Sequence, residues 1–476
     1  MTTPVLHPQQ GAPAPEPERT PTATAPARAR SGGLIALIAG SGGFVVLVIA
    51  LVFLVVTPRA LVVPPIPDEA VAAAAEGAAP GEALFGELNA ALESQDREAF
   101  FARVSGDAVA PLTLWWDNME QLGWTSAAMS GDEYDVPWSD GSVEVPVVLG
   151  ASLAFAAFAP RGSGGDDAGK HFVQGFRYVA SVDVVDEVAT ITGWRTDGPK
   201  AAWDFEPLYV ARGEHVLIAG RQSEQALVDS LVAEADEAAA WVLDDAEAQG
   251  RDLPLDGFNV FATDDQSIFD TWFVDEATAG WQMEAAAYAV PTTRPESWTE
   301  GMDTTIATGD STSTSVVFLG PSAMEQLDGT LPHEFEHVMH YTAVPSSWSD
   351  PPRVTVEGWA TYQENRRLYD GAYAPADSQA ILELSWCYDN MSSSGIADLA
   401  PEQFYVEDAF CYYQFGASMF AYLDSLGVDA WDVADAAKFD GVDPLTAAAA
   451  QGADVSEAAW QAWVDQQTAG VVAVRY

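Results

Sequence analysis

The chain has 476 residues, enough for two or three domains that each bury a core. Hydrophobic residues make up 48% of it and charged residues 19%, a balance typical of globular proteins. With 71 acidic against 20 basic side chains its formal net charge is −51, which argues against nucleic-acid binding because phosphate contacts need clustered basic residues. The two cysteines, Cys387 and Cys411, form one disulfide or stay as buried thiols, and they exclude a disulfide framework.

The N-terminal part predicts a membrane anchor. Residues 1–32 are rich in Pro, Ala and Thr and are expected to be a disordered cytoplasmic tail. The segment 33–57 contains an uncharged run, 34–56, whose helix would be about 35 Å long and would cross a ~30 Å hydrocarbon core. Three arginines precede this run, so we expect a single-pass protein of the cell membrane with its C-terminal domains extracellular. The proline-rich residues 58–81 predict a linker.

An α+β accessory domain is predicted over residues 82–220. It opens with leucines at helical spacing, Leu84, Leu88 and Leu92. β-branched runs follow at Val143–Leu149, Val182–Thr192 and His215–Ala219. Helices followed by a meander of strands predict a cone in which a curved antiparallel sheet wraps a helix. This order resembles the cystatin-like and nuclear-transport-factor-two-like folds.

A second α+β domain is predicted over residues 221–476, with a small sheet and a helical C-terminal part. A long amphipathic helix over 223–249 would be capped by Ser223 and terminated by Gly250. Strands are expected at Phe258–Ala262, Ala287–Pro291 and Ser315–Leu319, and mainly helices from about residue 321 onward.

Residues 333–337 of this domain read His-Glu-Phe-Glu-His, an HExxH motif. On a helix His333 and His337 project from one face, where two imidazoles can bind one Zn²⁺. Glu334 would then lie beside the metal's water, in the position of a general base. Pro332 is tolerated near the first turn of a helix, so Thr330 or a close neighbour is the expected cap.

The third metal ligand predicted is Glu357, twenty residues beyond His337 in the segment Val-Glu-Gly-Trp-Ala-Thr-Tyr-Gln-Glu. HExxH followed at this distance by Glu-Gly-aromatic-Ala resembles the gluzincin zinc peptidases, and most closely their aminopeptidase N-like branch. The resemblance implies that His333, His337 and Glu357 bind one Zn²⁺ and that Glu334 is the base. His340 is expected to support a ligand residue or to be packed, rather than to be a ligand itself. Glu336 and Glu364 are candidates to orient the ligand imidazoles, although solvated charges are equally plausible.

The same resemblance implies an oxyanion donor from a Tyr-x-x-Gly segment, which Tyr413 and Gly416 match, with Tyr412 as the alternative. The chain departs from the aminopeptidase pattern because it lacks the Gly-x-Met-Glu-Asn segment that holds a free amino terminus. Endopeptidase and exopeptidase activity therefore both remain open.

We thus expect a membrane-anchored, zinc-dependent peptidase that hydrolyses peptide or protein substrates with a metal-activated water. The alternative from another functional class is a catalytically inactive or ligand-binding cell-surface protein that retains the zinc site.

Overall fold

The computed structural model describes much of the chain from residue 80 onward, in ranges that all belong to one unit, residues 71–476. The ranges are 80–131, 141–155, 175–197, 200–251, 255–272, 287–291, 315–343, 351–369, 378–393 and 409–471, with the single residues 371, 373, 395, 396 and 404. The predicted tail, membrane helix and nearly all of the linker lie outside them. No helix in the described ranges is long and apolar enough to cross a membrane.

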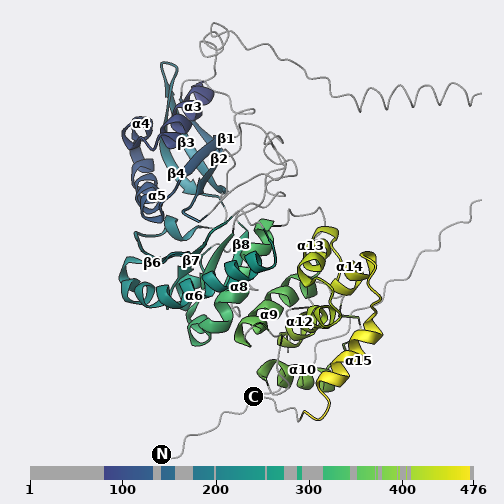
Figure 1. The fold of residues 1–476 in the computed structure, drawn as a ribbon. Coiled ribbons are helices and arrows are strands. Elements are labelled where there is room, and N and C mark those ends of the chain that lie inside the picture. The colour runs from purple at the N-terminus through teal and green to yellow at the C-terminus, as the bar shows by residue number, and fades with distance from the viewer. Residues whose placement is uncertain are drawn as a thin grey trace, which may run out of the picture. The chain divides into compact units, whose positions relative to one another are not determined.

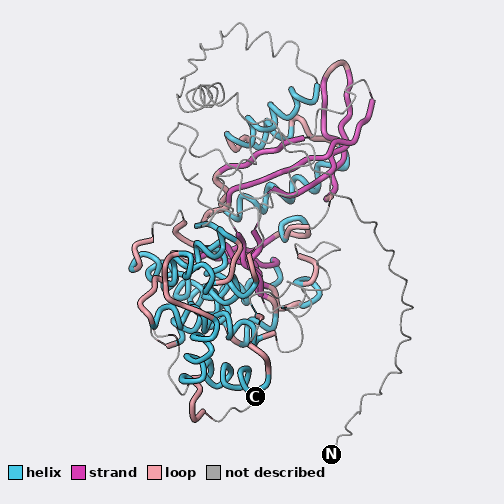
Figure 2. The backbone as a smooth tube through the Cα atoms, turned by 90° about the vertical axis from the view of Figure 1, so that its right-hand side faces the viewer, coloured by secondary structure: helices cyan, strands magenta, loops and turns pink. Residues whose placement is uncertain are grey.

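The fold is mixed α/β, with a curled sheet and many helices (Figures 1 and 2). The curled sheet is antiparallel in the order β1-β2-β3-β4, formed by Ser126–Gly131, Gly141–Ser152, Gly175–Val185 and Val188–Thr196. Helices α3 (Pro80–Glu93), α4 (Arg97–Phe101) and α5 (Val109–Leu122) accompany it. The predicted leucines of α3 are fully buried with β-strand residues in one core cluster, because their spacing places them on one helix face. Helix α3 begins at Pro80, inside the predicted linker.

The expectation of one strand over Val182–Thr192 is wrong, because this segment contains the end of β3 and the start of β4. Asp186 and Glu187 both have positive φ, 51° and 64°, and form the two-residue turn between β3 and β4. A tight hairpin of this kind needs left-handed residues, usually Asn or Asp followed by Gly, and Asp186–Glu187 lacks the glycine, so local pattern does not predict the turn.

The second sheet is mixed and has the order β5-β6-β7-β9-β8. Its strands are β5 (Leu208–Arg212), β6 (Val216–Arg221), β7 (Phe258–Ala262), β8 (Ala287–Pro291) and β9 (Ser315–Leu319). The central pairs β6–β7 and β7–β9 are parallel and the outer pairs antiparallel. Every residue of β7 is buried, and Phe258, Val260 and Ala262 belong to one core cluster and Phe261 to the other, as expected of a strand covered on both faces. The predicted run His215–Ala219 corresponds to β6, which begins at Val216 and belongs to this sheet rather than to the curled one.

Helices follow the second sheet, and no strand occurs in the described ranges after Leu319. Before them, α6 (Gln225–Ala248) connects β6 to β7 and α7 (Gln266–Phe269) follows β7. The later helices are α8 (Leu327–Ala343), α9 (Arg353–Leu368), α10 (Gln379–Asn390), α12 (Phe410–Ser425), α13 (Ala430–Asp440), α14 (Pro444–Ala450) and α15 (Glu457–Gln467). Short 3₁₀ turns lie at Gly106–Ala108, Ala202–Asp204, Gln222–Glu224 and Pro321–Glu325.

Two predicted helix starts are corrected. Ser223 lies in the 3₁₀ turn before α6, and Glu224 takes the N-cap position without a side-chain cap bond. Helix α8 begins at Leu327, so Pro332 lies inside it and Thr330 does not cap it. The N–H of Thr330 already donates to the carbonyl of Gln326, so a helical turn exists before the proline is reached. Pro332 then only fails to supply a donor to the carbonyl of Asp328.

Asp204 is a largely buried carboxyl group beside the curled sheet. It accepts hydrogen bonds from the hydroxyl of Tyr178, at 3.1 Å, and from the backbone N–H of Ala201, at 3.2 Å. Burial raises the pKa of Asp204 to about 7, against the effect of these two hydrogen bonds and of the charge on Lys200.

Asp204→Asn is expected to remove a pH dependence of stability. The folded protein binds the proton of Asp204 more tightly than the unfolded chain, so wild-type stability falls as the pH rises from about 4 to about 7. Asparagine mimics the protonated acid, so the free energy of unfolding of the variant should rise relative to wild type over that range. Urea unfolding at a series of pH values measures this difference, and a difference independent of pH would contradict the assignment.

Candidate metal centre

Helix α8 carries the HExxH motif and has two distinct faces. Leu331, Phe335, Val338 and Met339 are buried in the core cluster that contains one face of the second sheet. Phe335 stacks on Phe258 of β7, with ring centres 4.2 Å apart, and this contact fixes the helix against the sheet. His333 and His337 occupy another face, one turn apart, and their rings meet edge to face at 4.8 Å.

Glu357 of α9 completes a cluster with the two histidines. Its Oε2 lies 3.1 Å from Nε2 of His337 and 3.5 Å from Nε2 of His333. The side chains of His333, His337 and Glu357 are 12%, 8% and 10% exposed. One ligand atom from each residue lies within 4.8 Å of the others, so this His-His-Glu group could hold a metal ion. The structure thus brings together the three ligands predicted from sequence.

The donor set and its spacing fit a small divalent cation. Tetrahedral coordination with bonds of about 2.0–2.1 Å separates ligand atoms by about 3.3–3.4 Å. The two separations from Oε2 of Glu357 bracket that value. Two imidazoles and one carboxylate are a ligand set found in catalytic zinc sites, with the fourth position left for water.

Glu364, two turns after Glu357 on α9, orients His333. Its Oε2 lies 3.2 Å from Nδ1 of His333, which leaves Nε2 directed at the cluster. Gly329 makes room for this carboxylate, because a Cβ at that position would lie 2.7 Å from Oε1 of Glu364. The sequence left the role of Glu364 undecided and did not single out Gly329, since neither contact has a spacing signal.

The electrostatics of the cluster also favour a cation. Burial lowers the pKa of His333, but hydrogen bonds to Glu357 and Glu364 raise it well above its usual value. Burial raises the pKa of Glu357, but the charge of His337 and hydrogen bonds from both histidines hold it well below its usual value. The buried carboxylate therefore depends on positive charge from its neighbours, and a bound cation would supply such charge.

Three other residues of the motif region have different surroundings. Glu334 is buried, and its charge contributes to the raised pKa of His333. Glu336 accepts a hydrogen bond from Nε1 of Trp359 at 3.2 Å rather than orienting a ligand histidine. His340 is packed as expected, with Nε2 3.2 Å from the carbonyl oxygen of Ala434 and the ring near Trp359.

The candidate oxyanion donors lie at the start of α12. The ring centre of Tyr413 is 5.9 Å from that of His333, and it is 5.4 Å from that of Phe404. The ring of Tyr412 also lies 5.4 Å from Phe404. Cys411, just before this pair, forms a disulfide with Cys387 of α10, which decides the question that the sequence left open.

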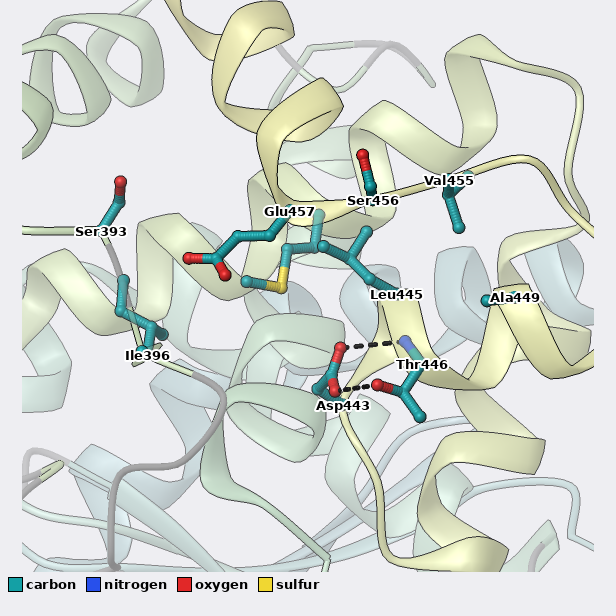
Figure 3. A pocket seen from close by; sticks show the side chains of 11 residues that line it. Ser393, Ile396, Asp443, Leu445, Thr446, Ala449, Val455, Ser456 and Glu457 are labelled. Carbon is teal, nitrogen blue, oxygen red and sulfur yellow. Dashed lines mark hydrogen bonds between the residues drawn. The ribbon is translucent and has the colours of Figure 1, made fainter.

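A pocket of about 240 Å³ lies away from these residues, in the C-terminal helices (Figure 3). Its apolar lining includes Met419 and Leu445. The carboxylate of Asp443 accepts from the backbone N–H of Thr446, and Ser456 accepts from that of Ala459, so both polar groups cap helices. These polar groups therefore have a structural role, and none of the residues that line the pocket belongs to the His-His-Glu group.

We expect the purified protein to retain about one metal ion per chain and His337→Ala to lose it. Glu364→Gln keeps all three ligands but weakens the orientation of His333, so the affinity for the metal ion should fall roughly 10- to 100-fold. His215→Ala is the matched control, because His215 lies outside the cluster and its Nδ1 meets the carbonyl of Asp256. Metal analysis and competition with a chromophoric chelator measure these effects. Stoichiometric metal in His337→Ala would remove His337 from the ligand set.

No model of a known protein family matches the sequence, and no curated protein matches it either. The residues of the cluster themselves therefore carry the case for a function.

Proposed function

We propose that the protein is a zinc-dependent peptidase of the gluzincin type. The observation that carries this proposal is the convergence of His333, His337 and Glu357 on one small buried volume, with Glu334 adjacent in the same helix. The resemblance of the two sequence motifs to gluzincins points to the same residues. The small mixed sheet followed by helices agrees with a gluzincin-like catalytic domain, which we include in the proposal.

The proposed cofactor is one Zn²⁺, held by His333, His337 and Glu357. A zinc ion bound there would act as a Lewis acid and make a water molecule more acidic. Glu364 would keep His333 in the tautomer and orientation that present Nε2 to the ion. Calcium and magnesium prefer oxygen ligands, so a site with two imidazoles favours zinc over them.

Glu334 is proposed as the general base. Its place directly after His333 would put the carboxylate within reach of the attacking water, whose proton it would accept and then deliver to the leaving amine. Tyr413, whose ring lies beside that of His333, would donate its phenolic hydrogen to the oxyanion that develops on the substrate carbonyl. In this proposal Glu334 would transfer protons and Tyr413 would stabilise the negative charge on the oxyanion.

We propose that residues 34–56 anchor the protein in the cell membrane and that its C-terminal domains are extracellular. This part of the proposal rests on the sequence alone, through the long uncharged run and the arginines that precede it. Peptides or proteins at the cell surface would then be the substrates.

Glu334→Gln should keep the bound zinc and the fold but lower kcat by about 10²- to 10⁴-fold, since it removes the base while preserving shape. Cleavage of a peptide library, with and without chelator, identifies a substrate for the measurement. Glu336→Gln is the matched control on the same helix, because its side chain contacts Trp359 rather than the cluster, and kcat should stay close to wild type. Wild-type protein that binds zinc but cleaves nothing would favour the alternative, a metal-binding surface protein without turnover.

Tyr413→Phe should lower kcat roughly 10²- to 10³-fold with KM and zinc content nearly unchanged, because the hydroxyl acts only as charge develops. Tyr412→Phe removes the same atom from the neighbouring residue and should have little effect. Steady-state kinetics on the same peptide distinguishes the two. A large loss in Tyr412→Phe alone would transfer the role to Tyr412, and wild-type rates in both would leave the oxyanion without a tyrosine donor.

A further inference from the structure

Helices α9 and α12 touch through their backbones at one point, formed by Gly358 and Gly416. The two helices run side by side (Figure 1). A Cβ on Gly358 would lie 2.6 Å from the Cα of Gly416, and a Cβ on Gly416 would lie 2.7 Å from the Cα of Gly358 and 2.6 Å from the carbonyl oxygen of Val354. Neither glycine has a positive φ, so space rather than backbone conformation requires them.

This close approach depends on the absence of side chains. Packed helices usually lie 8–10 Å apart, at a distance set by the residues in the contact. Ordinary van der Waals contact begins at 3.4 Å, whereas an added Cβ would meet backbone atoms at 2.6 Å. Backbone atoms cannot rotate away as a flexible side chain can, so a methyl group here would push the helices apart by about 1 Å.

The contact lies close to Glu357 on α9 and to Tyr413 on α12. Gly358 directly follows the candidate ligand Glu357, and Gly416 lies one turn after Tyr413. The neighbouring elements hold both helices firmly. Two hydrogen bonds of 2.7 and 2.9 Å from Arg366 to Asp245 tie α9 to α6. The disulfide of Cys411 ties the start of α12 to α10. The separation at the glycines therefore determines how far the ring of Tyr413 lies from the metal ligands.

We propose that Gly358 and Gly416 are positioning residues whose contact places Tyr413 beside the His333-His337-Glu357 group. The proposal rests on the peptidase function proposed above, and it assigns no direct contact with substrate to either glycine. A displacement of about 1 Å at a catalytic group can cost about 10²-fold in rate, so even a methyl group at this crossing is expected to matter.

The test is a double-mutant cycle with Gly416→Ala and Tyr413→Phe. Gly416→Ala alone should lower kcat about 10- to 100-fold at nearly unchanged KM and zinc content. In the Tyr413→Phe background the same substitution should change kcat less than about two-fold, because the hydroxyl that it displaces is already gone. Gly86→Ala is the matched control, since Gly86 is a helical glycine of α3 with no atom within 4 Å of an added Cβ, and its kcat should equal that of wild type.

Crystal structures without substrate provide a readout that does not depend on activity. The ring centres of His333 and Tyr413, 5.9 Å apart, should separate by about 1 Å in Gly416→Ala. This measurement tests the positioning role even if the wild-type protein is not a peptidase. Failure of the positioning role can therefore be distinguished from failure of the proposed function. An unchanged ring separation overturns the positioning role, as do losses of kcat that multiply in the double variant.

Gly358→Ala provides a second route if Gly416→Ala does not fold. It adds the same methyl group from the opposite helix and should give the same loss of kcat and the same dependence on Tyr413. If neither variant folds, the crossing is a requirement of folding rather than of the placement of the phenol, and the proposal is overturned.

Discussion

The buried carboxylate of Glu357 is the constraint around which the helical part is arranged. A carboxylate removed from water is costly unless positive charge and hydrogen bonds compensate for the lost hydration. Here the compensation comes from His333 and His337, which lie on a different helix, at 3.5 and 3.1 Å. The packing of α8 against α9 is thus an electrostatic requirement as well as an apolar one. A metal ion bound by the same atoms would satisfy that requirement more fully.

Contacts outside the His-His-Glu cluster hold the helices α8 and α9, which carry its residues, and the neighbouring helix α12. The stacked rings of Phe335 and Phe258 fix α8 to the second sheet. The ion pair of Arg366 and Asp245, with both side chains largely buried, fixes α9 to α6. The backbone contact of the two glycines then determines where α12 lies. Three different kinds of contact, aromatic, ionic and steric, therefore determine the geometry of a few side chains.

The acidic composition of the chain raises the free-energy cost of burying the carboxylate of Glu357. A formal charge of −51 opposes the burial of any further negative charge. Several described basic side chains of the helical part are used in ion pairs, such as Arg251 with Asp429 and Asp432, and Arg366 with Asp245. Positive charge inside the cluster comes from histidine instead, whose charge depends on its partners. A bound cation would replace this protonic charge, because metal ligation requires both imidazoles to be neutral.

The sequence by itself determined the spacings that depend on local periodicity. HExxH places two imidazoles on one face of any helix that contains it, and the three strands Phe258–Ala262, Ala287–Pro291 and Ser315–Leu319 followed from short apolar runs between breakers. Local pattern failed where the backbone did something unusual for its residues. The left-handed Asp186–Glu187 turn, the start of α6 after Ser223 and the start of α8 before Pro332 are such cases.

Only the tertiary structure decided what depends on contacts between distant segments. It placed the strand after His215 in the second sheet through parallel pairing with β7, and it paired Cys387 with Cys411. It also assigned Glu364 to His333 and Glu336 to Trp359, two carboxylates that the sequence treated alike. Periodicity fixes which side chains share a face, whereas the partner of that face depends on how whole elements pack, and local periodicity does not encode that choice.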